Sequence, residues 1–403
     1  MPKNRAIAAL AAAVALIVAA GVVVQVVTRG HGDDAASASV GATPPGTIKL
    51  SVSDAGCGGT WSLPHGGKVT FEITSDFQQG AEVELADVKK QLVYLDLEGF
   101  GPGATVDQTV TLGNGTYRFS CFPDEDIATK GKTVTITDAS GVKNPTPGVS
   151  PVDQNDLIPY AIKYQKWVAA QVPILRTRVN TLATDIAAGN IAKAKTDWLT
   201  AHLTYESMGA AYGTFGDLDD AINGEPAPGT TALADPKLTG FHKVEALLWS
   251  GASAAKAAPA VTALQGAVAK LAAAMPTLQQ DPNDLGLRAH EIVENAIQFE
   301  LTGQTDAGSH TNLATIGANL AGSQAVLNVI DPLLTSRYPQ LGATEQALAA
   351  SQKLVATYDH DGSWAALSSL DQLQREKLDA SLDQTVEDLA PIASILDERS
   401  HPL

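Results

Sequence analysis

The sequence predicts a multi-domain chain in which a small all-β sandwich is followed by an all-α helical bundle. From about residue 47 to 138, apolar and polar residues alternate, which is the period of half-buried strands. From residue 154 to the end, the chain is rich in Ala, Leu and Gln and shows long segments of helical period. With 403 residues, 44% of them hydrophobic, the chain has enough apolar side chains for two separate cores.

Charge and cysteine content exclude several classes of protein. The chain has 27 Lys and Arg against 44 Asp and Glu, so its formal net charge is −17. Such a chain repels phosphate backbones, which argues against nucleic acid as a partner and favours cations. Only two cysteines are present, and this number excludes four-cysteine zinc modules and thiolate-ligated iron–sulfur clusters.

Residues 1–27 are predicted to be a signal peptide or an N-terminal membrane anchor. Lys3 and Arg5 precede an apolar run over residues 6–27, which as a helix would span about 33 Å, enough to cross a bilayer. This length favours an anchor, whereas the small residues at 36–38 would serve as a cleavage site. In both cases the rest of the chain is extracytoplasmic, where disulfides persist.

Two segments without hydrophobic period separate the parts that are expected to fold. Residues 28–46, rich in Gly, Ser, Ala and Pro, are predicted to form a flexible tether. Residues 139–153 carry three prolines and are predicted to form an interdomain linker. In the β domain between them, 47–138, the pair Asn114-Gly115 stands between two apolar runs and predicts a two-residue hairpin turn.

The C-terminal domain, 154–403, is predicted to consist of helices separated by Gly, Pro, Asn or Asp. We expect these helices at about 154–188, 190–213, 236–252, 256–275, 283–302, 309–337, 343–359 and 368–398. Residues 212–228 interrupt the helical period with five glycines or prolines and several acids. They indicate a loop near whatever site the bundle contains.

Three histidines of the helical domain are followed by a glutamate at a spacing that puts both side chains on one helix face. The pairs are His202 with Glu206, His242 with Glu245, and His290 with Glu294. An imidazole and carboxylates on adjacent turns can share one cation, and such a ligand set suits iron better than copper(I). Alternatively, each pair is a salt bridge without a ligand role. Asp217 and Asp219 either cap the next turn or add a carboxylate to the cation site.

A zinc-peptidase signature is incomplete in this chain. His290 and Glu291 begin it, but position 294 is Glu where the second His is required. A metallopeptidase would need His242 and Glu245 to be completed from another helix, with Glu291 as the base. We therefore predict a binding protein and not an enzyme.

The two cysteines of the β domain have two interpretations. A disulfide between Cys57 and Cys121 would close a loop of about 65 residues and stabilise the fold by about 4 kcal/mol. Alternatively, both thiols bind a soft metal together with Glu82 or Glu84, which share one strand face. A blue-copper centre is disfavoured, because no His or Met closely follows Cys121 and the domain has only one histidine, His65.

Four motifs of the helical half occur in the same order in a known family. They are Trp198-Leu199-x-Ala201-His202-x-x-Tyr205-Glu206, Phe215-Gly216-Asp217-Leu218-Asp219-x-Ala221-Ile222, Gly240-Phe241-His242-x-x-Glu245-x-x-Leu248-Trp249 and Arg288-Ala289-His290-Glu291-Ile292-x-Glu294. Through them, residues 154–400 resemble the imelysin-like domain of the EfeO family, the extracytoplasmic iron-binding components of EfeUOB iron uptake systems. The β domain is similar to the cupredoxin-like domain of that family through its cysteines and its Glu82-Val83-Glu84 strand.

The resemblance implies a set of ligands and partners. His242 and Glu245 would form the HxxE metal motif of the family, with Glu206, an acid of the 217–219 loop such as Asp219, and Glu294 as further iron ligands. The cargo would be ferrous or ferric iron, and the β domain would bind copper or a second iron or dock on a partner. The expected partners are a membrane iron permease and a haem peroxidase.

These observations predict an extracytoplasmic protein that captures iron and delivers it to a membrane permease. The alternative is an imelysin-like module that binds an exported polymer or peptide and in which the HxxE pair is only structural. Loss of iron binding on replacement of His242 would distinguish the two hypotheses.

Overall fold

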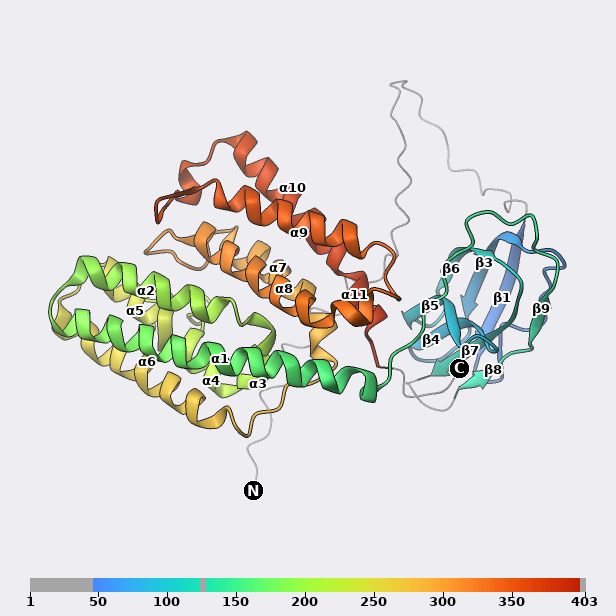
Figure 1. Ribbon diagram of the computed structural model, residues 1–403, viewed down its shortest axis with the longest axis horizontal. Coiled ribbons are helices and arrows are strands. Elements are labelled where there is room, and N and C mark those ends of the chain that lie inside the picture. Colours follow the sequence, from blue (N-terminus) through green and yellow to red (C-terminus); the bar gives the residue numbers. More distant parts are fainter. Residues whose placement is uncertain (1–45, 124–127, 399–403) are drawn as a thin grey trace. The chain divides into compact units, whose positions relative to one another are not determined.

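The computed structural model describes residues 46–123 and 128–398, which form two compact units, 46–148 and 149–398. The first unit consists of strands and the second is mainly helical (Figure 1). The predicted fold class, a small all-β sandwich followed by an all-α bundle, is therefore confirmed. The predicted signal or anchor at 1–27 lies outside the described residues, as does the tether at 28–46 except for its last residue.

The β unit contains two sheets. Its strands are β1 (Thr47–Ser53), β2 (Gly56–Cys57), β3 (Gly67–Ser75), β4 (Ala81–Asp87), β5 (Leu92–Phe100), β6 (Thr105–Leu112), β7 (Gly115–Pro123), β8 (Thr129–Lys130) and β9 (Val134–Ile136). One sheet has the order β2-β1-β3-β6, with β1 and β3 parallel, and the other has the order β5-β4-β7-β8, with β9 paired to β7. Both sheets contribute to one core, in which Trp61, Phe71 and Phe119 pack edge to face at centroid distances of 5.1–5.9 Å.

The prediction of a two-residue hairpin turn at Asn114-Gly115 is wrong. β6 pairs with β3 in one sheet, whereas β7 pairs with β4 in the other, so the chain passes between the sheets at this point. Gly115 is required there by close packing, because a Cβ would lie 2.6 Å from an oxygen of Asp87 and 2.7 Å from the ring of Tyr117. Sheet-to-sheet packing overrides the local turn preference.

The segment 139–153, predicted as a linker, belongs in part to each unit. Thr146 exchanges two hydrogen bonds with Thr111 of β6, donating through its backbone N–H and accepting through its side chain. Val152 is buried in the helical unit. Asp153 caps the first helix through a capping box with Asp156.

The helical unit follows the expected pattern with some differences at the ends of its elements. Its helices are α1 (Gln154–Ala187), α2 (Ile191–Glu206), α3 (Tyr212–Phe215), α4 (Asp217–Asn223), α5 (Gly240–Trp249), α6 (Ala254–Ala274), α7 (Asp284–Asn295), α8 (Asn312–Leu334), α9 (Leu341–Ala356), α10 (Gln372–Leu389) and α11 (Pro391–Ile395). The helix expected at 283–302 continues from α7 into a π-helical turn, Ala296–Glu300. The helix expected at 368–398 is divided into α10 and α11, and a short hairpin of β10 (Asp359–His360) and β11 (Ser363–Trp364) follows α9.

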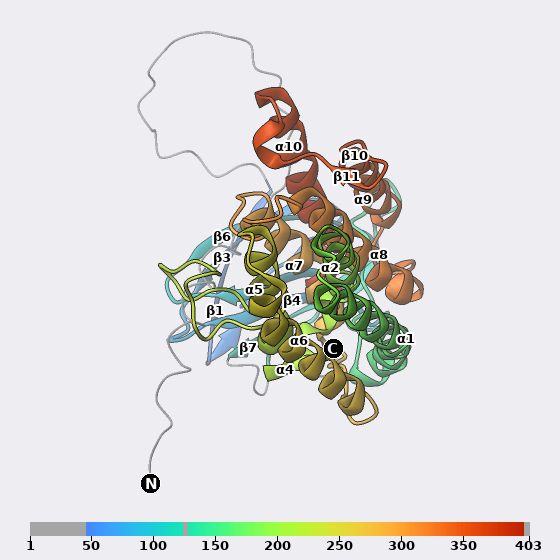
Figure 2. The same ribbon diagram turned by 90° about the vertical axis from the view of Figure 1, so that its left-hand side faces the viewer.

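Within this unit, α1 packs against α2 and α6, while α8 lies between α7 and α9 (Figures 1 and 2). The helix α8 is apolar and long enough to cross a membrane, but 67% of its most hydrophobic window is buried in the bundle, as expected of a core helix. At the start of α5, Gly240 has a φ of +79°, and a Cβ there would lie 2.2 Å from the carbonyl oxygen of Ile222 in α4. Glycine thus permits α4 and α5 to approach closely two residues before His242.

Candidate metal centre

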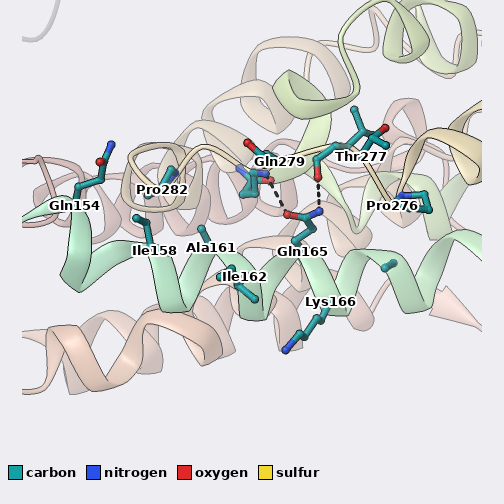
Figure 3. A pocket seen from close by; sticks show the side chains of 13 residues that line it. Gln154, Ile158, Ala161, Ile162, Gln165, Lys166, Pro276, Thr277, Gln279 and Pro282 are labelled. Carbon is teal, nitrogen blue, oxygen red and sulfur yellow. Dashed lines mark hydrogen bonds between the residues drawn. The ribbon is translucent and has the colours of Figure 1, made fainter.

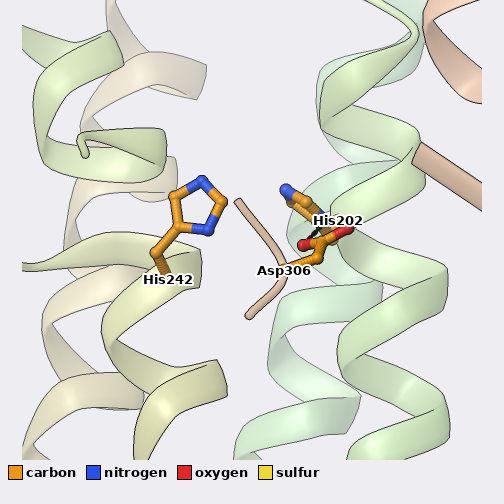
Figure 4. A group of neighbouring side chains, drawn as sticks. All are labelled: His202, His242 and Asp306. Carbon is orange, nitrogen blue, oxygen red and sulfur yellow. Dashed lines mark ion pairs between the residues drawn. The ribbon is translucent and has the colours of Figure 1, made fainter. Parts of the chain in front are cut away.

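Three side chains from different parts of the helical unit form a buried cluster. His202 of α2, His242 of α5 and Asp306 of the loop before α8 each offer a ligand atom, and these atoms lie within 4.8 Å of one another. Their residues are 0%, 4% and 1% exposed. The two imidazole rings lie edge to face with centroids 5.4 Å apart, and Asp306 lies beside His202 (Figure 4). Two imidazoles and a carboxylate are suitable ligands for a transition-metal ion.

Packing between α2 and α5 positions the two imidazoles. The ring of Trp198 stacks on that of His202 with centroids 4.7 Å apart. The indole Nε1 of Trp198 donates a hydrogen bond of 2.9 Å to the carbonyl oxygen of Phe241, the residue before His242. The buried side chain of Trp198 therefore holds both histidine-bearing helices together.

Asp306 was not predicted from the sequence. It stands in the loop 301–311 with a φ of +48°, a backbone conformation that is uncommon outside glycine. Thr315 and Thr311 donate to its Oδ2 at 2.5 and 3.3 Å, and its Oδ1 lies 3.8 Å from Nδ1 of His202. The threonines orient the carboxylate so that Oδ1 faces the cluster. The positive φ is a structural signal of a specialised loop that residue spacing does not reveal.

Glu206, one of the expected ligands, adjoins the cluster. Its Oε1 lies 3.0 Å from Nε2 of His202 and accepts a hydrogen bond of 2.7 Å from Nδ2 of Asn223. The amide nitrogen of Asn319, in its hydrogen-bonding orientation, lies 2.9 Å from Oε2. Glu206 is 5% exposed, so this carboxylate is held in place within the protein interior.

Glu245 has a different partner from the one expected. Its Oε1 accepts hydrogen bonds from the backbone N–H groups of Gly308 (3.0 Å) and Ser309 (2.7 Å). His242 instead has its Nε2 3.1 Å from Oε1 of Glu225, a residue the sequence analysis did not select. The HxxE carboxylate thus fixes the loop that carries Asp306.

Asp219 and Glu294 lie outside the three-residue cluster. Asp219 accepts a hydrogen bond of 2.5 Å from the hydroxyl of Tyr205 and lines an adjacent cavity. Glu294 is on the exposed side of α7, with a side chain that is 50% exposed and 3.8 Å from His290. The expectation that Glu294 is an iron ligand is corrected, because the rotation of α7 directs this position to solvent.

The electrostatic field of the site favours positive charge. Burial lowers the pKa of His242, but the hydrogen bond and charge of Glu225, with further charges from Asp306 and Glu245, raise it to about 10. Burial likewise opposes protonation of His202, whose pKa is nevertheless raised by Glu206. Burial tends to raise the pKa of Glu206, but the neighbouring imidazoles lower it overall. Carboxylates that stabilise imidazolium in this way also attract a metal cation.

A cavity of about 220 Å³ adjoins the cluster. It is lined by Glu206, Asp219, Glu225, Glu300 and other polar residues. Burial and the nearby charge of Glu206 are among the factors that raise the pKa of Asp219 to about 6. Burial and the charges of Glu206 and Asp306 also raise the pKa of Glu300 well above its usual value. These shifts reflect the crowding of carboxyl groups in and beside the cavity.

In the β unit, Cys57 and Cys121 form a disulfide between β2 and β7. Cys121 is paired with Val83, so Glu82 and Glu84 project from the opposite face of β4. The hypothesis of a thiolate site completed by these glutamates is therefore corrected. Glu82 and Glu84 instead lie with Asp96, with one oxygen from each within 4.8 Å of the others. Burial and the charge of Glu98 raise the pKa of Glu84 to about 7.

A larger groove of about 680 Å³ lies between α1 and residues 276–282 (Figure 3). Gln165 spans one side of it, because its side chain donates to the carbonyl oxygen of Leu278 and accepts from the backbone N–H of Gln280. Among the described residues that line this groove, none is His, Asp or Glu. The groove therefore lacks the ligands of a metal site.

The fold and the buried cluster define a two-domain chain with a candidate metal centre inside a helical bundle. The chain belongs to the imelysin family, peptidase M75, which matches residues 161–392. It is 26% identical over 350 residues to the iron uptake system component EfeO of Yersinia pestis, and 25% identical to that of Escherichia coli K12. Each match covers 87% of this chain and 91% of the relative. Auracyanin from Roseiflexus castenholzii, solved in the dithionite-reduced form, matches 24% of this chain and 99% of its own at 18% identity, with a TM-score of 0.18.

Proposed function

We propose that this chain is an extracytoplasmic iron-binding component of an iron uptake system. It captures ferrous or ferric iron in the helical unit and delivers it to a membrane iron permease, with a haem peroxidase as a further partner. The observation that supports this proposal best is the convergence of His202, His242 and Asp306 on one buried position, with Glu206 alongside. The similarity to the iron uptake system component EfeO over most of both chains supports iron as the cargo.

The chemistry of the cluster agrees with a carrier of iron. Imidazole nitrogens are good ligands for iron, and carboxylate oxygens compensate the charge of a hard cation. The cluster is nearly inaccessible to solvent, so a bound ion would be separated from bulk water. Iron analysis of the full-length chain after exposure to ferrous ion and desalting tests the proposal directly, and the absence of bound iron would contradict it.

We propose binding and not hydrolysis, although the family is described as a peptidase family. A hydrolytic centre requires a general base that is free to act on a metal-bound water. Glu291, the expected base, is instead paired with the guanidinium of Arg288 at 2.6 Å. The carboxylate of Glu245 accepts hydrogen bonds from two backbone N–H groups, which suits a positioning role. The peptidase hypothesis would gain support from cleavage of an unfolded protein substrate that Glu245→Gln abolishes.

Iron binding is expected to release protons, so that affinity falls as the pH decreases. At pH 7 the imidazole of His242 is protonated, since its pKa is about 10, whereas a metal ion binds the neutral form. If binding releases one proton, the affinity for the ion decreases about tenfold for each unit by which the pH is lowered. Calorimetry of ferrous ion binding in two buffers with different ionisation enthalpies measures the number of protons. Equal enthalpies in both buffers, with unchanged affinity between pH 7 and pH 6, would contradict this expectation.

A further inference from the structure

Two glutamates line the cavity beside the cluster and also contact the histidines of the cluster. Glu206 lines the cavity and lies 3.0 Å from His202, while Glu225 lines it and lies 3.1 Å from His242. Because the cluster itself is buried, an ion that reaches it needs a route through the protein. The cavity has a volume of about 220 Å³, which can hold a hydrated ion. It is separated from the two histidines by these two glutamates.

The lining of this cavity is rich in oxygen ligands. Five of its residues carry carboxyl groups, Glu206, Asp219, Glu225, Glu291 and Glu300, and one, Arg288, is cationic. The guanidinium of Arg288 is paired with Glu291 at 2.6 Å, while Glu206 and Glu225 lie beside the imidazoles of His202 and His242. Asp219 and Glu300 supply carboxyl oxygens, and no His or Cys is among the described residues that line the cavity, so the lining suits a hard cation.

Glu300 provides an independent indication of a ligand. It ends the π-helical turn Ala296–Glu300 and is only 7% exposed. Its Oε1 accepts a hydrogen bond of 3.2 Å from Thr305, whereas Oε2 is buried and has no hydrogen-bond partner within residues 46–123 and 128–398. A buried carboxylate oxygen without a partner is unfavourable unless a ligand satisfies it. π-Helical turns are also frequent at functional sites.

We propose that this cavity is a second cation position, in which Glu300 and Asp219 hold an iron ion next to the buried cluster. The proposal rests on the proposed function and assigns ligands to two sites. Asp219 and Glu300 serve the outer position, while His202, His242 and Asp306 serve the inner one. Glu206 separates the two positions. The π-helical turn leads directly into the loop of Asp306, so Glu300 of the outer position and Asp306 of the inner position lie on one continuous segment.

The number of ions bound by the full-length chain tests this proposal. Anaerobic calorimetry with ferrous ion is expected to show two binding events in the wild type. Glu300→Gln keeps the size of the side chain and an acceptor for Thr305 but removes the charge, and it is expected to lose one event. The remaining event should keep its affinity within about threefold, because the inner ligands are intact. The matched control is Glu387→Gln on the exposed face of α10, which should retain both events.

The outcomes distinguish this inference from the proposed function. A single event in the wild type that Glu300→Gln leaves unchanged overturns the second position but not the iron carrier. Two events that both persist in Glu300→Gln also overturn it. The absence of any event in the wild type contradicts the proposed function itself. If Glu300→Gln fails to fold, Asp219→Asn, which keeps an oxygen for the hydroxyl of Tyr205, is expected to lose the same event, and its retention would overturn the proposal.

Discussion

Replacement of His242 by alanine is expected to lower the affinity for iron by at least about 100-fold, since the loss of even an outer-shell partner costs 10- to 100-fold. His242 supplies one of the two imidazoles of the buried cluster. Among the described residues of the cluster, the other imidazole belongs to His202. Its ring already lies beside Glu206 and Asp306, so it does not compensate for the loss of the His242 ligand. Anaerobic calorimetry of the full-length chain with ferrous ion measures the change.

The control for this variant is His360→Ala, because His360 is exposed on β10. It is expected to bind iron like the wild type. His242→Gln is a second variant that retains a polar side chain opposite Glu225, which separates loss of a ligand from loss of the fold. Affinity within about threefold of the wild type in both His242 variants would show that the cluster does not bind the iron, and would favour a structural role for the HxxE pair.

Helical spacing was sufficient to predict part of the site. His202 and Glu206 are four residues apart on α2, and their side chains meet at 3.0 Å as this spacing requires. Spacing also placed His242 on a buried helix face. It could not assign the partner of Glu245, because the two N–H groups that bind this carboxylate belong to a loop more than 60 residues away in the sequence.

Sequence analysis missed the residues that are not part of a His–Glu pair at a helical spacing of three or four residues. Asp306 and Glu225 lie in loops, and their positions depend on tertiary contacts with α2 and α5. Glu300 lies on a π-helical turn inside a segment that looks uniformly helical in sequence. The failed hairpin at Asn114-Gly115 has the same cause, since packing between the sheets decides where β7 pairs. Local patterns thus predicted elements well, whereas contacts between elements required the structure.

Removal of the disulfide by the double substitution Cys57→Ser and Cys121→Ser is expected to lower the free energy of unfolding of the β unit by about 4 kcal/mol. The bond joins two residues that are 64 positions apart and lie in different sheets. Without it, the unfolded chain gains the entropy of that large loop, and two polar hydroxyls are placed where the cysteines are 3% and 0% exposed. Hydrogen exchange followed by mass spectrometry resolves peptides of residues 46–123 from those of the helical unit, so the loss can be assigned to one unit.

The same variant tests whether sulfur has any part in iron binding. All residues of the proposed inner and outer positions belong to the helical unit, so the double serine variant should bind ferrous ion with the stoichiometry and affinity of the wild type. Reduction of the wild-type disulfide should reproduce the faster exchange in the β unit without changing iron binding. Unchanged exchange after reduction would contradict the stabilising role of the bond. A loss of bound iron in the serine variant would show instead that the cysteines contribute to a metal site.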